Sequence, residues 1–80
     1  MVLKILGSEN ECDALEKATR TALHDLMLDG MPVERVTDAR QVAAHGVRRT
    51  PALLADGHEL VSGRVPTAAE LQALLSAAKV

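Results

Sequence analysis

The chain has 80 residues, a net charge of −2 and no aromatic residue. It therefore lacks the basic face and the stacking side chains with which proteins bind nucleic acids. No apolar run is long enough to span a membrane or to act as a signal peptide. The length predicts a single domain over residues 1–80, and the lone cysteine excludes an internal disulfide. We expect a cytoplasmic protein that binds neither nucleic acid nor membranes.

The chain is expected to begin with a buried strand and a long helix. Residues 2–6 are almost all apolar, which is typical of a central strand covered on both faces. Ser8 and Glu11 have the spacing of a capping box and predict a helix that starts around residues 10–12. An apolar stripe and two acid–base pairs at i, i+4 define its two faces. The stripe is Leu15, Ala18, Ala22 and Leu26, with Thr19 and Leu23 beside it, and the pairs are Asp13–Lys17 and Glu16–Arg20.

The middle of the chain predicts a second strand and a short helix. Residues 29–32 (DGMP) should stop the first helix, and residues 33–37 have the β-branched content of a strand. Asp38 can cap a helix over residues 39–45, which Gly46 closes.

The last third predicts a hairpin followed by a helix. Residues 52–55 and 58–61 are separated by Asp56-Gly57, a strong two-residue hairpin signal. Thr67 and Glu70 form a second capping-box pattern that opens the last helix. The element order is therefore β-α-β-α-β-β-α, and its first β-α-β unit should be parallel.

Three segments of this pattern resemble the thioredoxin-like superfamily, and most closely its small bacterial and archaeal thioredoxins of the redox-active disulfide type. Gly7–Leu15 is a unit of strand end, glycine turn, cysteine and helix. Gly46–Leu53 contains Thr-Pro-Ala-Leu and is followed by Asp56-Gly57, and Gly63–Pro66 leads into the last helix. The resemblance covers almost the whole chain, and the Thr-Pro-Ala-Leu segment is its most specific part.

The resemblance implies an α/β fold with a four-stranded mixed sheet in the order 2-1-3-4. The first and third helices would lie on one face and the second helix on the other. It also implies that Pro51 is cis, which would place the backbone of Thr50 beside the active site, where an extended peptide can pair with it. Without the resemblance, a trans proline opening an edge strand would be the expected conformation.

The sequence departs from the family at the redox motif. The family has Cys-x-x-Cys at the start of the first helix, and alignment on Leu15-Glu16-Lys17 places Cys12 on the second cysteine. Glu9 then stands at the first position, although the turn before it is about one residue short. A carboxylate cannot form a mixed disulfide, so a dithiol cycle within one chain is excluded.

Cys12 could still act as a single thiol. A helix N-terminus favours a thiolate, but Glu9, Glu11 and Asp13 oppose it by charge repulsion. We therefore predict a Cys12 pKa at or above its ordinary value. The other interpretation is that Cys12 is a small, partly buried core residue.

The remaining candidate residues are two arginines and several possible metal ligands. Arg48 and Arg49 could attract glutathione or an acidic peptide, or they could be a solvated pair in a loop. Glu9 and Cys12 offer at most two ligands, and the three histidines lie on different elements. We expect no metal site and no cofactor.

The favoured function is a peptide- or protein-binding module with a degenerate redox site. The binding residues would be Glu9, Asn10, Glu11, Arg49, Thr50 and Pro51. The alternative is a thiol–disulfide oxidoreductase in which Cys12 is catalytic and glutathione or a partner protein supplies the second sulfur. The sequence carries no signal for an oligomeric state.

Overall fold

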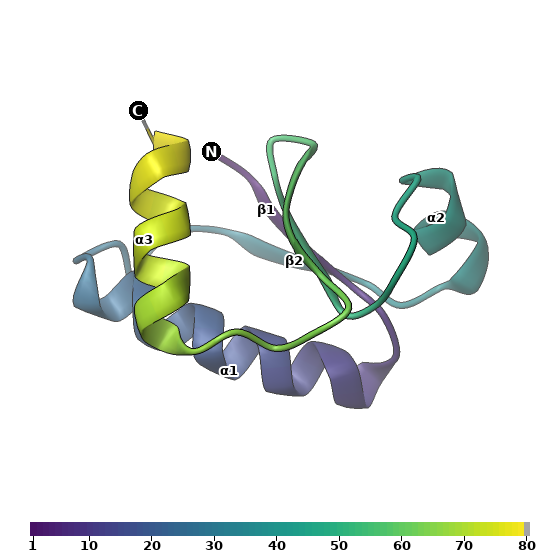
Figure 1. The fold of residues 1–80 in the computed structure, drawn as a ribbon, viewed down its shortest axis with the longest axis horizontal. Helices are drawn as coiled ribbons and strands as arrows, with labels where there is room; N and C mark the ends of the chain where they lie inside the picture. The colour runs from purple at the N-terminus through teal and green to yellow at the C-terminus, as the bar shows by residue number, and fades with distance from the viewer. Residues whose placement is uncertain (80) are drawn as a thin grey trace.

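The computed structural model describes residues 1–79, and its seven elements follow the order expected from the sequence (Figure 1). They are β1 (Leu3–Leu6), α1 (Glu9–Asp25), β2 (Val33–Val36), α2 (Ala39–Ala44), β3 (Ala52–Ala55), β4 (His58–Ser62) and α3 (Ala68–Lys79). No helix in this part of the chain is long and apolar enough to cross a membrane.

The four strands form one mixed sheet in the order β2-β1-β3-β4, which confirms the expected topology. β1 and β2 are parallel, whereas β1–β3 and β3–β4 are antiparallel. Leu6 at the end of β1 pairs with Val36 on one side and with Ala52 on the other. One end of the sheet therefore holds the last residues of β1 and β2 and the first residue of β3.

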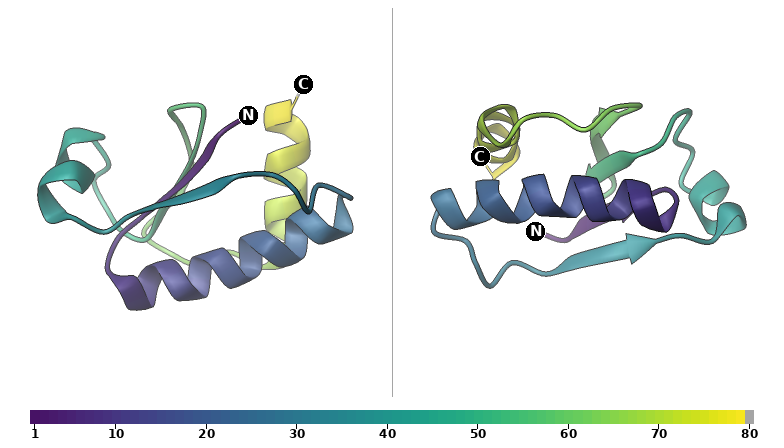
Figure 2. Two further views of the ribbon diagram at one scale, coloured as in Figure 1. Left: turned by 180° about the vertical axis from the view of Figure 1, so that it is seen from behind. Right: turned by 90° about the horizontal axis from the view of Figure 1, so that it is seen from below.

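Each face of the sheet has its own core, because side chains alternate along the strands. Ile5 and Leu53 point to the larger core, which α1 and α3 cover with Leu15, Leu23, Leu71 and Leu75. Leu6 and Leu54 belong to the smaller core, against which Val42 and Val47 pack. The first and third helices therefore share a face and α2 covers the other, as expected; Figure 2 shows α2 at the end of the molecule away from α3.

The β3–β4 hairpin has the predicted two-residue turn. Asp56 and Gly57 have φ angles of 50° and 84°, which is the conformation that two-residue hairpins favour. The Asp56 carboxylate also accepts a hydrogen bond from the backbone N–H of Val2, at 2.8 Å, and the Asp56 N–H donates to the Val2 carbonyl. The turn is thereby attached to the strand beside it.

The predicted capping residues are correct at all three helices. Ser8 caps α1, Asp38 accepts hydrogen bonds from the backbone N–H groups of residues 40 and 41, and Thr67 Oγ1 accepts one from Glu70 N. Because Ser8 is itself the N-cap, α1 begins at Glu9 rather than within residues 10–12.

α1 ends earlier than predicted, at Asp25 instead of the turn at residues 29–32. Met27 has a φ of +60°, and its N–H donates to His24 O while Leu28 N–H donates to Leu23 O, at 2.7 Å. These two bonds form a Schellman motif, in which the left-handed position is usually a glycine. Residue 27 is not a glycine, and the sequence pattern therefore predicted that the helix stops at the turn that contains Gly30.

Candidate functional site

The first turn of α1 is closed by a reciprocal capping box. The Glu11 N–H donates to Ser8 Oγ at 3.2 Å, and the Ser8 N–H donates to Glu11 Oε1 at 2.9 Å. The carboxylate of Glu11 is therefore fixed over the turn that joins β1 to α1. These hydrogen bonds lower the pKa of Glu11, and the backbone N–H of Ser8 has the largest effect.

Cys12 lies one turn into α1 and points at the sheet. Its side chain is fully buried, and Sγ lies 3.7 Å from both Ile5 O and Gly7 O, to which the thiol can donate. Burial raises the pKa of Cys12. The direction agrees with the prediction, but the main cause is burial rather than charge repulsion.

Charges near Cys12 act in both directions. The carboxylates of Glu11, Asp13 and Glu16 raise its pKa, whereas the guanidinium of Arg35 lowers it. Glu9, which the sequence argument included among the repelling groups, is not one of the groups that shift the Cys12 pKa. Sequence reasoning missed Arg35 because this residue is far from Cys12 along the chain.

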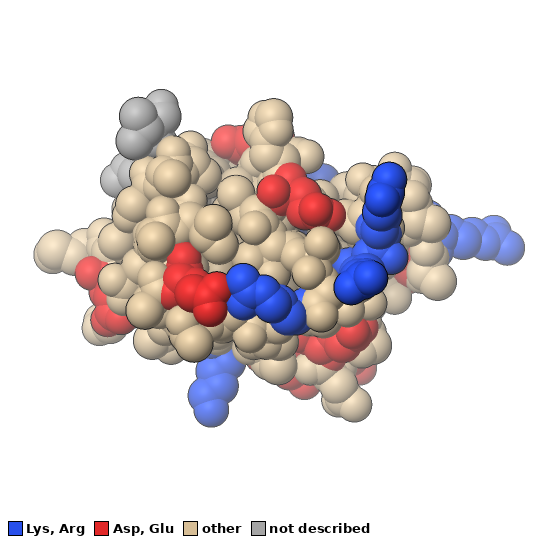
Figure 3. Space-filling view, in the orientation of Figure 1, with Lys and Arg blue, Asp and Glu red and all other residues tan. Residues whose placement is uncertain are grey.

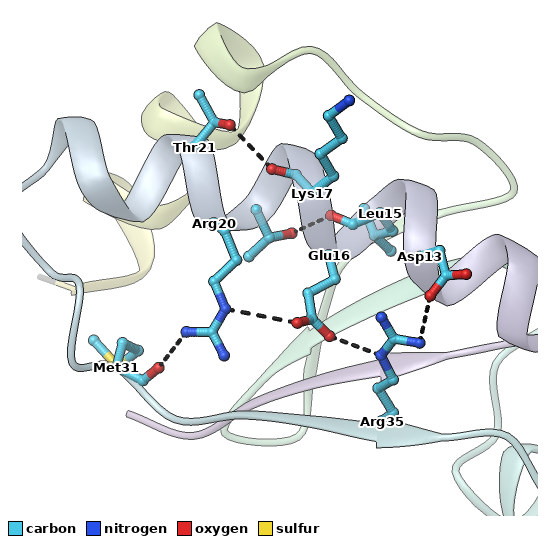
Figure 4. A network of polar contacts seen from close by, with 9 residues as sticks. Asp13, Leu15, Glu16, Lys17, Arg20, Thr21, Met31 and Arg35 are labelled. Carbon is cyan, nitrogen blue, oxygen red and sulfur yellow. Dashed lines mark hydrogen bonds and ion pairs between the residues drawn. The ribbon is translucent and has the colours of Figure 1, made fainter.

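Arg35 on β2 joins that strand to α1 (Figure 4). Its guanidinium contacts Asp13 Oδ1 and Glu16 Oε1, each at 2.7 Å. Glu16 also pairs with Arg20 at 3.7 Å, as predicted. The predicted pairing of Asp13 with Lys17 is wrong, because the register of β1 with β2 places Arg35 beside Ile5, on the face that α1 covers.

The loop that precedes β3 has the geometry implied by the resemblance. The Thr50–Pro51 peptide bond is cis, and Pro51 is buried. The Pro51 carbonyl accepts a hydrogen bond from Gly63 N at 3.0 Å. Within residues 1–79, the backbone N–H and C=O of Thr50, a half-buried residue, make no hydrogen bond.

Glu11 and Thr50 connect this loop to the start of α1. Thr50 Oγ1 donates to Glu11 Oε2 at 3.3 Å. Gly7 makes this approach possible, since a Cβ at Gly7 would lie 2.9 Å from Glu11 Oε1 and 3.3 Å from Thr50 Cβ. The contact therefore depends on the missing side chain at residue 7.

A largely apolar groove of about 430 Å³ opens beside Thr50. It extends from the end of β1 to α2, and its lining includes Gly7, Val42, Ala43, Val47 and Thr50. Arg48 also lines this groove, and it lines a second, polar hollow with Arg49 and Glu59. The loop of residues 46–50 therefore separates an apolar groove from a polar hollow.

The structure brings only some of the predicted site residues together. Glu11, Thr50 and Pro51 are adjacent, whereas Arg49 lines the polar hollow and not the groove. Glu9 and Asn10 are exposed in the first turn of α1. Within residues 1–79, no group of three His, Cys, Asp or Glu side chains could hold a metal ion. The groove at α2 was missed, because Val42 and Val47 gave only a short apolar pattern.

Comparison with known proteins gives two matches. A family model described as "Thioredoxin domain" matches residues 1–76. A protein named "Thioredoxin" from Methanothermobacter thermautotrophicus is 32% identical over 77 residues, which are 95% of this chain and 99% of that relative. No solved structure matches the chain significantly.

Proposed function

The chain belongs to the thioredoxin family, and we propose that it binds an extended segment of a partner protein without catalysing dithiol exchange. The observation that carries the proposal is the combination of a single, fully buried cysteine with an unpaired backbone at Thr50. The first feature removes the redox cycle, and the second leaves a surface that a peptide can use.

The redox cycle needs two sulfur atoms with different roles. A thiolate attacks a disulfide and forms a mixed disulfide, which a second thiol then resolves. This chain has one cysteine, and Glu9 is the first residue of α1, one helical turn before Cys12. A carboxylate at that position can hold a charge or accept a hydrogen bond, but it cannot form an S–S bond.

Cys12 is poorly suited to act alone. Attack on a disulfide requires an accessible thiolate, whereas Cys12 has no exposed surface and a raised pKa. The two backbone carbonyls near Sγ favour the protonated thiol, because a carbonyl oxygen can only accept from it. These features support a structural role for Cys12 in the core.

Binding would use the backbone of Thr50 and the groove beside it. An extended peptide that lies along Thr50 can form the two main-chain hydrogen bonds that this residue lacks within residues 1–79. The groove of about 430 Å³ next to Thr50 can then take one apolar side chain of that peptide. Main-chain pairing supplies affinity, and the groove supplies selectivity.

Reduction of insulin by dithiothreitol tests the redox half of the proposal. We expect the wild-type protein and Cys12→Ser to leave the rate of insulin precipitation unchanged from that of dithiothreitol alone. Acceleration that is present in the wild type and lost in Cys12→Ser would instead establish the single-thiol oxidoreductase.

Restoring the missing cysteine tests the place of Glu9 in the motif. We expect Glu9→Cys to form an internal disulfide with Cys12 under mild oxidant, because the two residues are one helical turn apart at the start of α1. Asn10→Cys is the matched control. It should form no disulfide with Cys12, since residues two apart on a helix point in different directions. Absence of the disulfide in Glu9→Cys would show that Glu9 does not occupy the first cysteine position.

A further inference from the structure

The loop of residues 46–50 carries two arginines that have no partner in the described part of the chain. Neither Arg48 nor Arg49 forms an ion pair or a side-chain hydrogen bond within residues 1–79, although both are exposed. Arg20, Arg35 and Arg64 each pair with a carboxylate. Among the described residues Arg40 on α2 is unpaired as well, but it lines neither the groove nor the polar hollow. We propose that the partner segment is acidic: one apolar side chain enters the groove at α2, and the adjacent carboxylates contact Arg48 and Arg49. This inference rests on the proposed function.

The side chain of Arg49 packs against Gly63. A Cβ at Gly63 would lie 3.0 Å from Arg49 Cδ and 3.2 Å from Arg49 Cβ, so the aliphatic stem of Arg49 lies directly on the glycine backbone. Gly63 is fixed in turn by its hydrogen bond to the Pro51 carbonyl. The carbon atoms of Arg49 therefore pack on Gly63, while its guanidinium is left to contact a carboxylate.

Arg48 connects the apolar and polar parts of the surface. It lines both the groove beside Thr50 and the polar hollow that contains Arg49. Figure 3 shows Lys and Arg side chains gathered between α2 and the β3–β4 hairpin. The groove therefore adjoins this positive charge through Arg48.

Three carboxylates limit where an acidic peptide can lie, and the one at the binding edge is Glu11, whose Oε2 accepts a hydrogen bond from Thr50 Oγ1. Glu59 lines the polar hollow with the arginines and partly offsets their charge. Glu9 is exposed at the start of α1, next to the groove-lining residue Ser8. The side of the cleft near α1 is therefore acidic and the side near the loop of residues 46–50 is basic. This asymmetry favours peptide carboxylates at Arg48 and Arg49 and disfavours them beside Glu11.

Fluorescence anisotropy with three labelled peptides tests the inference. The peptides alternate Val with Glu, Val with Gln, or Val with Lys, because an extended chain places alternate side chains on opposite sides. We expect the Val-Glu peptide to bind about fivefold more tightly than Val-Gln, as two exposed charge pairs would give. Its advantage should shrink as salt is raised, because exposed charges are screened.

Paired variants locate the effect. Arg49→Gln keeps the carbon atoms that contact Gly63 and removes the charge, so it should retain the fold and lose part of the preference for Val-Glu. The double variant Arg48→Gln/Arg49→Gln should bind Val-Glu and Val-Gln equally. Lys17→Ala removes one positive charge from α1, outside both hollows, and should leave the preference unchanged. Glu59→Gln should increase the preference for Val-Glu, because it removes a negative charge from the polar hollow.

The outcomes separate this inference from the proposed function. Equal binding of Val-Glu and Val-Gln to the wild type would overturn the acidic preference and leave peptide binding intact. Binding of none of the three peptides would overturn both. An acidic preference that survives in the double variant would show that Arg48 and Arg49 do not produce it.

Discussion

Thr50 donates a hydrogen bond from Oγ1 to Glu11 Oε2, at 3.3 Å, across 39 residues of sequence. The other oxygen of the same carboxylate accepts from Ser8 N at 2.9 Å. One side chain therefore caps α1 and also holds the residue before the cis-proline. The position of Thr50, whose backbone is the proposed binding edge, thus depends on the first turn of α1.

This relationship predicts a pH-dependent contribution of Glu11 to stability. Its pKa is lowered in the folded protein, so its stabilising effect is present above the unfolded pKa of about 4.3 and is lost as the pH falls through the lower folded value. Glu11→Gln should cost up to about 1 kcal/mol at neutral pH, because the residue is partly exposed, and should cost little in strong acid. Urea unfolding of both proteins across this pH range measures the difference.

Glu34 provides the control for Glu11. It is exposed on β2 and makes no side-chain hydrogen bond to residues 1–78, so Glu34→Gln should change stability much less at every pH. An effect of Glu11→Gln that does not depend on pH would show that the charge of Glu11 is not the stabilising feature.

The close approach of Glu11 to Thr50 predicts that residue 7 must be glycine. Gly7 has a φ of +145°, and a Cβ there would come within 2.9 Å of Glu11 Oε1. Gly7→Ala should therefore lower the free energy of unfolding by about 1–2 kcal/mol or more. At Gly30 a Cβ would meet nothing within 4 Å, so Gly30→Ala should be neutral or slightly stabilising. Equal effects of the two substitutions in urea unfolding would contradict this account.

Met27 predicts a stabilising substitution. It holds the left-handed position at the end of α1 with a φ of +60°, and its side chain is 88% exposed. Met27→Gly removes backbone strain of about 1–2 kcal/mol and adds about 0.5–1 kcal/mol of unfolded-chain entropy, which leaves a gain of about 0.5–1 kcal/mol. Leu26→Gly, at a residue with a φ of −90° that packs on the core, should destabilise. A thermal midpoint of Met27→Gly below that of the wild type would show that Met27 carries no such backbone strain.

Arg35 predicts a change in the titration of Cys12. Its guanidinium lowers the pKa of the buried thiol, so Arg35→Gln should move the titration of Cys12, followed by its 13Cβ chemical shift in the folded protein, to higher pH. Arg20 pairs with the same Glu16 but is not among the charges that shift the Cys12 pKa. Arg20→Gln should therefore leave the pH profile in place, and identical profiles for Arg35→Gln and the wild type would rule out the electrostatic coupling.

The sequence predicted features that depend on local contacts better than those that depend on strand register. Ser8, Asp38 and Thr67 were identified as caps because each bonds to a backbone group only two or three residues away. The pairing of Arg35 with Asp13 spans 22 residues and follows only once β1 and β2 are aligned. The end of α1 was missed for a different reason, since Met27 adopts a conformation that its residue type rarely takes.

In the candidate site, too, the features carried by a local motif were predicted, and those that need several elements together were not. The resemblance correctly implied the cis bond before Pro51, since a motif in the sequence carries it. The groove beside Thr50 needs β1, α2 and the loop of residues 46–50 together. No single segment of sequence contains that information.

The most direct test of binding without thiol chemistry is the amide chemical shift of Thr50 during titration with the Val-Glu peptide, recorded for the wild type and for Cys12→Ala. We predict that the Thr50 amide shifts in both proteins with the same midpoint. An unchanged Thr50 amide in the wild type, or a shift that disappears in Cys12→Ala, would contradict it.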